Sequence, residues 1–458
     1  MITSKKHTEI EFSYEQLRLV KFGGSSIATP NRLRNVLKLI STKQPVLIIL
    51  SALFGTTDKL VELVNFIKNG EQNAFVGVIL DLKVEYKKFV SELYVTAHYR
   101  DIATALIHQT FNQLEDYAER KYKIKIEKNI LAVGERLSTQ ILNLLLQEEG
   151  LRTTLLNATD FVFIKKSGLP DYDRIEMNLK AILNKSKAAQ IYITQGFLCT
   201  NALGELDNLQ RGGSDYTATI LASVLKVKEV EIWTDIDGVH NNDPRYVEQT
   251  APLNYLSYDE ASYLAFFGAK ILHPLCIAPA KKANIPIRLK NTLKPENVGT
   301  LIHDQVIGEG IKAVSAKDNI QIIKVSSKRE RASHDFYNEV FKVLNKHKVS
   351  SDLITTSEES VSLAIEESEI LHKLSEALKP LGVVEIEDGL SAICIAGEFL
   401  KDSKGIGKEI FESLLEIPLR MISYGGNRHH LALLIQSQHK QKALLSLNNH
   451  LFKIAGEI

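Results

Sequence analysis

The sequence has few cysteines, almost no excess charge and no long apolar run. Its three cysteines, Cys199, Cys276 and Cys394, are widely separated among 458 residues. Such scatter excludes a cysteine-rich zinc site and favours a reducing compartment. Lys and Arg number 56 against 55 for Asp and Glu, so the basic excess typical of nucleic-acid binders is missing. We expect no nucleic-acid partner.

Membrane and secretion signals are missing as well. The longest strongly apolar run, residues 46–54, is far shorter than the ~20 residues that cross a bilayer. Residues 1–7 contain no apolar core of a signal peptide. With 44% hydrophobic and 24% charged residues, the composition is that of an ordinary globular protein. We expect a cytoplasmic protein of several domains with no membrane partner.

The first two thirds of the chain alternate strand-like and helical segments. Strand-like runs cover residues 17–22, 45–50, 190–194 and 229–233, and a largely helical stretch covers residues 59–128. Continuous apolar runs of this kind are typical of strands covered on both faces in a parallel sheet. Each run ends in polar or glycine-bearing residues, and α/β sheets bind ligands at the carboxyl ends of their strands. The sequence predicts an α/β sheet with a site at that edge.

The character of the chain changes near residue 303, after a turn-rich segment. Two shorter units follow, and each begins with a strand-like run, over residues 320–325 and 390–396. The repeated order of strand, helix and strand indicates a pair of small α+β modules. We therefore predict three domains, which cover residues 1–303, 304–390 and 391–458.

Two glycine clusters precede predicted helices. In the first, Lys21 stands beside Gly23 and Gly24; glycines let a backbone approach an anion, and a helix N-terminus favours negative charge. This pattern suits phosphate, but a tight turn with a surface lysine explains it equally well. The second cluster, Arg211-Gly-Gly-Ser-Asp215, offers a guanidinium for a carboxylate or phosphate. Its Asp215 either caps the helix or binds an ammonium group.

Other polar segments are ambiguous when each is taken alone. Glu135 follows an apolar run, and a solvated helix start explains it more simply than a site does. Residues 234–245 form a polar loop that reads as an Asx/Pro turn. His273, before a proline, is expected to pack or to cap a helix. The sequence has no P-loop, no metal-ligand spacing of His, Cys and Asp, no Gly-x-Ser-x-Gly elbow and no protein-kinase His-Arg-Asp segment.

Together these segments resemble the aspartate kinases, which belong to the amino-acid kinase fold. The entry segment is Leu19-Val-Lys-Phe-Gly-Gly-Ser-Ser-Ile27, and the later segments follow in the family's order. Those segments are Ser51-Ala52, Gly134-Glu135, Gln195-Gly-Phe197, Arg211-Gly-Gly-Ser-Asp215, Trp233-Thr-Asp235, Asp243-Pro-Arg245 and Gly268-Ala-Lys-Ile-Leu-His-Pro274. The sequence departs from the family at Gln210, where Gly is frequent, and at His240, where Tyr is frequent. The resemblance implies a three-layer sandwich around an open, mostly parallel sheet.

The resemblance also implies ATP-dependent phosphorylation of the β-carboxylate of L-aspartate, the first step toward lysine, threonine and methionine. A carboxylate with a solution pKa of about 3.9 is already ionised, so it needs no general base. The enzyme must instead bring two anions together and stabilise the charge on the transferred phosphoryl group. Cations and backbone donors suit this task better than a serine or histidine nucleophile.

The family's residue roles carry over to matching positions. Lys21 and Asp215 would be catalytic. Aspartate would be bound by Ser51, Thr57, Glu135, Arg211, Gly212 and Ser214. ATP would be bound by Lys21, Gly23, Gly24, Thr234, Asp235, His240, Arg245, Lys270 and Ile271. The cofactor would be ATP with Mg²⁺ carried mainly on its phosphates, without a dedicated metal site.

The C-terminal part resembles two ACT modules, the effector-binding units of this family. Residues Ser333, Phe336, Ser351, Asp352, Thr356, Ser357 and Glu358 would bind an amino-acid effector, for which lysine is our first expectation and threonine the second. Glu330 and Tyr337 differ from the apolar residues common there. The modules imply a homodimer or homotetramer. The alternatives are another amino-acid kinase, acting on glutamate, acetylglutamate or UMP, and a catalytically inactive amino-acid sensor.

Overall fold

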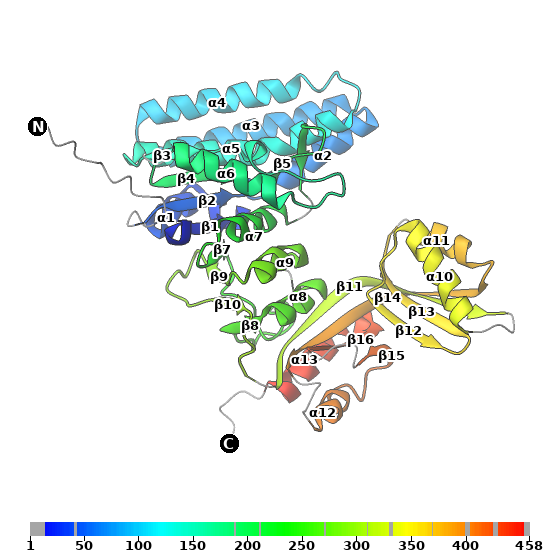
Figure 1. Cartoon of the computed structure of the whole chain (residues 1–458). Coiled ribbons are helices and arrows are strands. Elements are labelled where there is room, and N and C mark those ends of the chain that lie inside the picture. The colour runs from blue at the N-terminus through cyan, green and yellow to red at the C-terminus, as the bar shows by residue number, and fades with distance from the viewer. Residues whose placement is uncertain are drawn as a thin grey trace, which may run out of the picture. The chain divides into compact units, whose positions relative to one another are not determined.

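The computed structural model divides into two compact units, which Figure 1 shows as a ribbon. The first unit comprises Met1–Gly238 and Leu272–Asp304, and the second comprises Val239–Ile271 and Gln305–Ile458. The residues that the structure describes are 14–40, 44–186, 189–209, 212–269, 272–308, 310–328, 333–368, 370–398, 404–424 and 429–452. Within these residues, no helix combines the length and the apolar character needed to cross a membrane.

The first unit is built on an open sheet with mostly parallel strands. Its order is β3-β4-β2-β1-β7-β9-β10, in which β10 runs antiparallel to β9 and the other neighbours are parallel. The strands are β1 (Arg18–Phe22), β2 (Val46–Leu50), β3 (Thr153–Leu155), β4 (Ile191–Gln195), β7 (Val230–Thr234), β9 (Ile287–Asn291) and β10 (Thr300–His303). A hairpin of β5 (Leu198–Thr200) and β6 (Leu206–Asn208) stands apart from this sheet.

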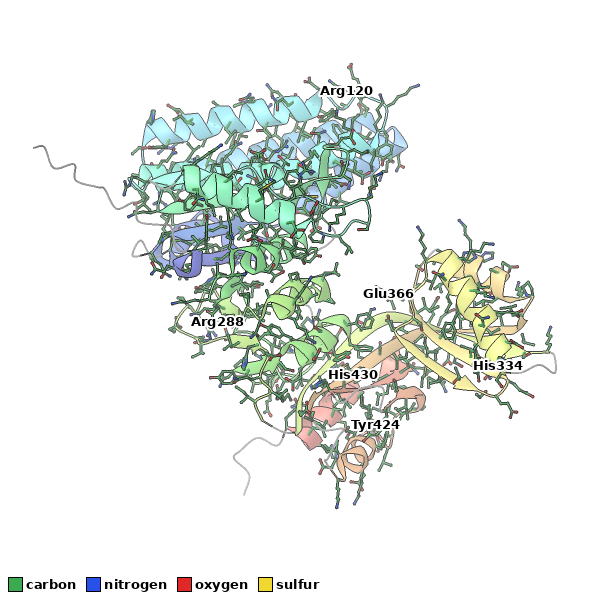
Figure 2. The ribbon with its side chains drawn as sticks, viewed as in Figure 1. Arg120, Arg288, His334, Glu366, Tyr424 and His430 are labelled. Atoms are coloured by element: carbon green, nitrogen blue, oxygen red, sulfur yellow. The ribbon has the colours of Figure 1, made fainter. Side chains whose placement is uncertain are left out.

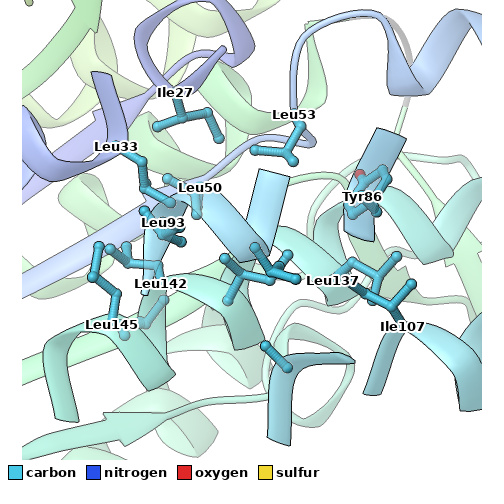
Figure 3. Close-up of a cluster of buried hydrophobic side chains, with 14 of the residues drawn as sticks. Ile27, Leu33, Leu50, Leu53, Tyr86, Leu93, Ile107, Leu137, Leu142 and Leu145 are labelled. Atoms are coloured by element: carbon cyan, nitrogen blue, oxygen red, sulfur yellow. The ribbon is translucent and has the colours of Figure 1, made fainter. Parts of the chain in front are cut away.

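Helices cover both faces of the sheet. The helices are α1 (Pro30–Leu39), α2 (Thr56–Asn69), α3 (Gln72–Leu93), α4 (Ala97–Glu115), α5 (Ile124–Glu148), α6 (Tyr172–Lys185), α7 (Gly213–Leu225) and α9 (Pro274–Ala283). Alternate residues of β1 and β2, such as Val20 and Ile48, pack into a buried cluster with α1 to α5; Figure 3 shows part of that cluster. Helix α7 contacts β1, β2 and β7 and packs with α6 and α9. The predicted α/β sandwich is confirmed.

The second unit holds a continuous six-stranded sheet in the order β12-β13-β11-β14-β16-β15. Its strands are β11 (Gly310–Ser327), β12 (Leu353–Ser357), β13 (Ser360–Glu366), β14 (Gly382–Glu398), β15 (Leu419–Ser423) and β16 (His430–Gln436). The second unit also contains the short β8 (Tyr255–Ser257), which is not part of this sheet. Its helices are α8 (Tyr258–Phe266), α10 (Ser333–His347), α11 (Ile370–Leu378), α12 (Ile406–Ser413) and α13 (Lys440–Leu451).

Two long strands belong to both C-terminal modules. Residues 320–327 of β11 pair with β13 and with the first half of β14, whereas residues 310–317 pair with its second half. Each half has its own buried cluster, one containing Ile323 and Leu363 and the other containing Val314 and Leu433. The first module is therefore inserted between the strands of the second.

This arrangement differs from the predicted boundaries. The module expected at 391–458 also uses residues 310–317, and residues 239–271 group with the C-terminal unit instead of the first. Val247 from that segment is 2% exposed inside the core of the second module. Strand pairing between distant segments leaves no local pattern in the sequence, which is why the boundaries were misplaced.

We predict that Gly299→Ala destabilises the first unit by about 2–4 kcal/mol, which denaturant unfolding can measure. Gly299 has a φ of +73°, and a Cβ there would overlap the carbonyl oxygen of Leu289. Gly204→Ala is the matched control, because its φ is +80° with open space around it. That control should lose only about 1 kcal/mol. Equal losses in the two variants would contradict the overlap.

Candidate active site

Lys21 and Asp215 form the centre of the site. Lys21 stands near the end of β1, and strand alternation turns its side chain away from the cluster of Val20 and Phe22. Its Nζ lies 2.5 Å from the Asp215 carboxylate, and the two side chains are only 10% and 15% exposed. Asp215 lies in the first turn of α7, but the N-cap of that helix is Gly212. The acid therefore faces a cation at the sheet edge and does not cap the helix.

The loop after β1 lies close to the ends of the neighbouring strands. A Cβ at Gly24 would lie 2.9 Å from the carbonyl oxygen of Ala52, and one at Gly23 would lie 3.4 Å from Lys21 Nζ. Ser25 Oγ donates to Asp235 Oδ1 at 3.1 Å, and Thr234 Oγ1 donates to the same oxygen at 3.1 Å. The glycine loop and the end of β7 thus meet beside Lys21.

Glu135 is buried within α5 and is not a solvated helix start, so that interpretation was wrong. It is 4% exposed. Its Oε2 accepts hydrogen bonds from the backbone N–H groups of Gly196 at 2.8 Å and Phe197 at 2.5 Å, and its Oε1 accepts one from Ser214 Oγ at 2.7 Å. Burial raises the pKa of Glu135 to about 7, although these hydrogen bonds and the charge of Lys21 oppose the rise.

Glycines allow the elements around Glu135 to meet. A Cβ at Gly196 would lie 2.5 Å from the Cβ of Ser214, and one at Gly134 would lie 2.8 Å from the Cβ of Ala52. Thr217 Oγ1 also donates to the carbonyl oxygen of Gly196 at 2.5 Å. The turn after β4 therefore packs closely against α7, and α5 packs closely against the loop after β2.

The loop after β2 carries two more of the predicted aspartate-binding residues. Ser51 is half-buried, and its carbonyl oxygen accepts a hydrogen bond from Ser138 Oγ at 2.8 Å. Thr57 is exposed in the first turn of α2. The neighbouring Thr56 is buried instead, and its hydroxyl lies 2.9 Å from that of Tyr86.

Gly212 has a positive φ of +81°, and a Cβ there would lie 2.5 Å from the Cβ of His273. His273 caps α9 through its Nδ1, which accepts from the N–H of Leu275 at 3.3 Å. The predicted packing and capping role of His273 is confirmed.

Some predicted residues lie elsewhere. His240 and Arg245 belong to the second unit. There, His240 Nδ1 lies 2.8 Å from Thr250 Oγ1, and Asp243 holds the Arg245 guanidinium with oxygens 2.5 and 2.9 Å away. Arg211, Lys270 and Ile271 fall outside the described residues.

Polar residues at the end of β9 also make contacts at this edge of the sheet, and the sequence analysis did not predict them. Thr292 Oγ1 donates to the carbonyl oxygen of Thr234 at 2.5 Å and lies 2.8 Å from Ser26 Oγ. Asn291 hydrogen-bonds the Asp237 carboxylate. The available signal was a polar Asn-Thr pair directly after a strand-like run, which we assigned to a closing turn.

No cluster of three or more His, Cys, Asp or Glu side chains placed to hold a metal ion occurs among the described residues. The acids nearest the glycine loop, Asp215 and Asp235, have partners in Lys21, Ser25 and Thr234. The first unit therefore brings together a buried cation, glycine loops and a buried carboxylate.

The seven predicted effector residues belong to the first C-terminal module, where Ser351 and Asp352 lie before β12 and Ser357 and Glu358 lie at its other end. Ser333 Oγ donates to the carbonyl oxygen of Glu358 at 2.9 Å, and Asp352 pairs with Lys317 at 2.8 Å. Ser351 Oγ lies 2.7 and 2.8 Å from two carbonyl oxygens. Thr356, Ser357 and Glu358 are exposed. Phe336 is 1% exposed and packs in the core of the module.

Sequence comparison identifies two families along the chain. Residues 16–291 match the amino acid kinase family, and residues 393–451 match the ACT domain. Lysine-sensitive aspartokinase 3 of Escherichia coli is 30% identical over 94% of this chain and 98% of its own length. The chloroplastic aspartokinase 2 of Arabidopsis thaliana is 28% identical over 95% of this chain and 84% of its own length.

Solved structures agree with this assignment. Escherichia coli aspartokinase III in complex with aspartate and ADP (R-state) has a TM-score of 0.84 at 28% identity, covering 95% of this chain and 100% of that one. The same enzyme in complex with lysine and aspartate (T-state) has a TM-score of 0.75 at 29% identity, covering 96% and 100%. The chain therefore belongs to the aspartokinases, within the amino acid kinase family.

Proposed function

We propose that this chain transfers the γ-phosphoryl group of ATP to the β-carboxylate of L-aspartate, which gives 4-phospho-L-aspartate. The observation that carries the proposal is the meeting of Lys21, Asp215 and Glu135 at the carboxyl edge of the sheet, beside two glycine loops. A buried cation at such an edge suits phosphoryl transfer between two anions.

Lys21 has the central chemical role in this proposal. Its ammonium lies beside the Gly23–Gly24 loop and would stabilise the charge that spreads over the transferred phosphoryl group. Asp215 holds the ammonium in place through their ion pair. The aspartate carboxylate attacks in its ionised form, so no side chain has to remove a proton.

The remaining contacts are assigned by resemblance, and only those of Thr234, Asp235, Glu135, Asp215 and Ser214 are also supported by position. Thr234 and Asp235, beside the glycine loop, would hold ATP together with His240, Arg245, Lys270 and Ile271. Mg²⁺ would be carried on the ATP phosphates, where it neutralises charge. Glu135 and Asp215 would bind the α-ammonium of aspartate, and Arg211 its α-carboxylate. Ser51, Thr57, Gly212 and Ser214 would complete the aspartate site.

The hydroxylamine trap tests this function directly. An acyl phosphate formed from aspartate and ATP is captured as a hydroxamate. Parallel reactions with glutamate, acetylglutamate and UMP, in which the release of ADP is measured, test the activities of other amino-acid kinases. Product with aspartate alone is expected. ADP release with another acceptor would show that this acceptor is the substrate. No product from any acceptor would favour an inactive sensor.

Lys21→Ala should lower kcat by about 10²–10³-fold while the KM for ATP changes little. The reason is that the charge of Lys21 is needed mainly as the phosphoryl group moves. Steady-state kinetics measures both constants. Lys166→Ala, at an exposed position of the same unit, is the matched control and should behave like the wild type. Near-normal turnover of Lys21→Ala would remove its assigned role.

The kcat/KM for aspartate should rise as the pH increases from about 6 to about 8. Glu135 has a pKa of about 7, so it gains the negative charge needed to bind an ammonium group across this range. Glu135→Gln cannot ionise; its kcat/KM should be lower and should lose this rise. An unchanged pH profile in that variant would place the titrating group elsewhere. Thermal unfolding of both proteins controls for the loss of a hydrogen bond.

We also propose that lysine acts as a feedback effector on the first C-terminal module. Asp352, the acid expected to receive its ammonium group, is already paired with Lys317, whose Nζ also lies 3.2 Å from Glu366, labelled in Figure 2. The same Nζ lies 4.9 Å from the centre of the Phe266 ring. An effector ammonium would therefore compete with an ammonium that the chain itself supplies.

Lys317→Met should lower the lysine concentration for half-maximal inhibition several-fold, because Asp352 would be left without its internal partner. Inhibition curves measured at fixed aspartate and ATP check this. Lys324→Met is the matched control, since Lys324 lies on the same strand and is paired with Glu385 at 3.5 Å on the surface. Weaker inhibition in Lys317→Met would mean that Lys317 binds the effector's carboxylate instead. A parallel curve with threonine tests the second effector.

The quaternary state and location complete the proposal. ACT modules pair across subunits in this family, so we propose a homodimer or homotetramer, which light scattering on the eluting protein can distinguish. The three cysteines are free and buried, which suits the reducing cytoplasm.

A further inference from the structure

A polar cavity lies in the helical layer of the first unit, between α4 and α5. Its volume is about 280 Å³. Along α4 it is lined by Gln109, Thr110 and Gln113, and along α5 by Asn129, Arg136 and Gln140. Gln113 follows Thr110 by three residues and Gln109 by four, whereas Asn129, Arg136 and Gln140 follow one another by seven and four residues. Each set therefore lies on one face of its helix.

Arg136 is the unusual residue in this cavity. Its side chain is half-buried, and burial lowers the pKa of its guanidinium. Within the described part of the chain, it has no hydrogen bond from its guanidinium and no ion pair. Arg18, Arg32 and Arg34 of the same unit each have an oxygen partner at 2.6–3.7 Å. A half-buried guanidinium has lost part of its hydration, so an acceptor bound in the cavity would stabilise it.

The lining suits an anion and excludes a cation. It contains no acidic residue, whereas its amides, hydroxyls and guanidinium offer donors. Glu115, near the end of α4, is paired instead with Lys83 at 3.5 Å. Leu106, Leu114 and Leu137 form the apolar part of the wall, which limits the water that would screen a bound charge.

The cavity is separate from the catalytic edge but shares a helix with it. Arg136 follows Glu135 directly, and one residue turns an α-helix by 100°. Glu135 therefore points toward Gly196 and Ser214 while Arg136 points toward α4. An occupant of the cavity would stabilise the turn of α5 that carries Glu135.

We propose that this cavity is a second ligand site, which binds a small oxyanion, either a carboxylate or a phosphate, through the forked guanidinium of Arg136. The planar guanidinium can donate two parallel hydrogen bonds to either group. The volume admits a small dicarboxylate or a phosphate, and the flanking amides would bind its remaining oxygens. This inference does not depend on the identity of the reaction at the sheet edge.

The test uses calorimetric titration of the full chain with succinate in one arm and inorganic phosphate in the other. Saturating ADP and aspartate are present throughout, so that the catalytic site is closed to both probes. At least one probe should bind the wild type, and Arg136→Gln should weaken that binding at least tenfold. Arg152→Gln, an exposed arginine of the same unit, is the matched control and should bind as the wild type does.

Each outcome bears on the proposal. Binding of succinate alone would identify the ligand's charged group as a carboxylate, and binding of phosphate alone would identify it as a phosphate. Failure of both probes, or equal binding by Arg136→Gln, overturns the site. In the absence of anions, Arg136→Gln should be at least as resistant to heat as the wild type, because it removes a half-buried charge that has no ion-pair partner among the described residues. A lower melting temperature together with dissociation of an oligomer would instead assign Arg136 to a subunit interface.

Discussion

The arrangement of the catalytic edge depends on one buried carboxylate. Glu135 accepts hydrogen bonds from two backbone groups that follow β4 and from a hydroxyl on α7, although it belongs to α5. A buried carboxylate without partners would be unfavourable by several kcal/mol, so the three donors and the acid require one another. The glycines at 134 and 196 leave the space that this approach needs. Helix α7, fixed in this way, presents Asp215 to Lys21.

The parts of the fold that the sequence predicts well are those encoded locally. The apolar runs that became β1, β2, β4 and β7 are short and bounded by glycine or polar residues, and their strand character needs no distant partner. The closeness of Lys21 and Asp215 followed from strand ends sharing one edge and from the family's motifs. The burial of Glu135 was not predictable, because its partners lie 61, 62 and 79 residues away in the sequence. The grouping of residues 239–271 with the C-terminal unit has the same cause.

A short stretch of the chain links residues proposed to bind the effector with residues proposed to act in catalysis. Lys317 stands beside Asp352 and near the ring of Phe266, at the end of α8. Gly268 follows with a φ of +97°, and a Cβ there would overlap the carbonyl oxygen of Ala316, beside Lys317. A few residues later, His273 begins α9 and lies against Gly212, at the start of the helix that holds Asp215. A shift of α8 would therefore act directly on the short stretch of chain that leads from α8 to α9.

The sharing of β11 and β14 between the two C-terminal modules bears on how the protein is made. On the ribosome, residues 310–317 emerge early, but the strand segment that pairs with them, residues 392–398, emerges only after the whole first module. The inserted module can complete its sheet and core during synthesis, while the exposed half of β11 waits with unsatisfied backbone groups. The order of translation therefore imposes an order of assembly, and a truncation after residue 390 would leave an open strand edge.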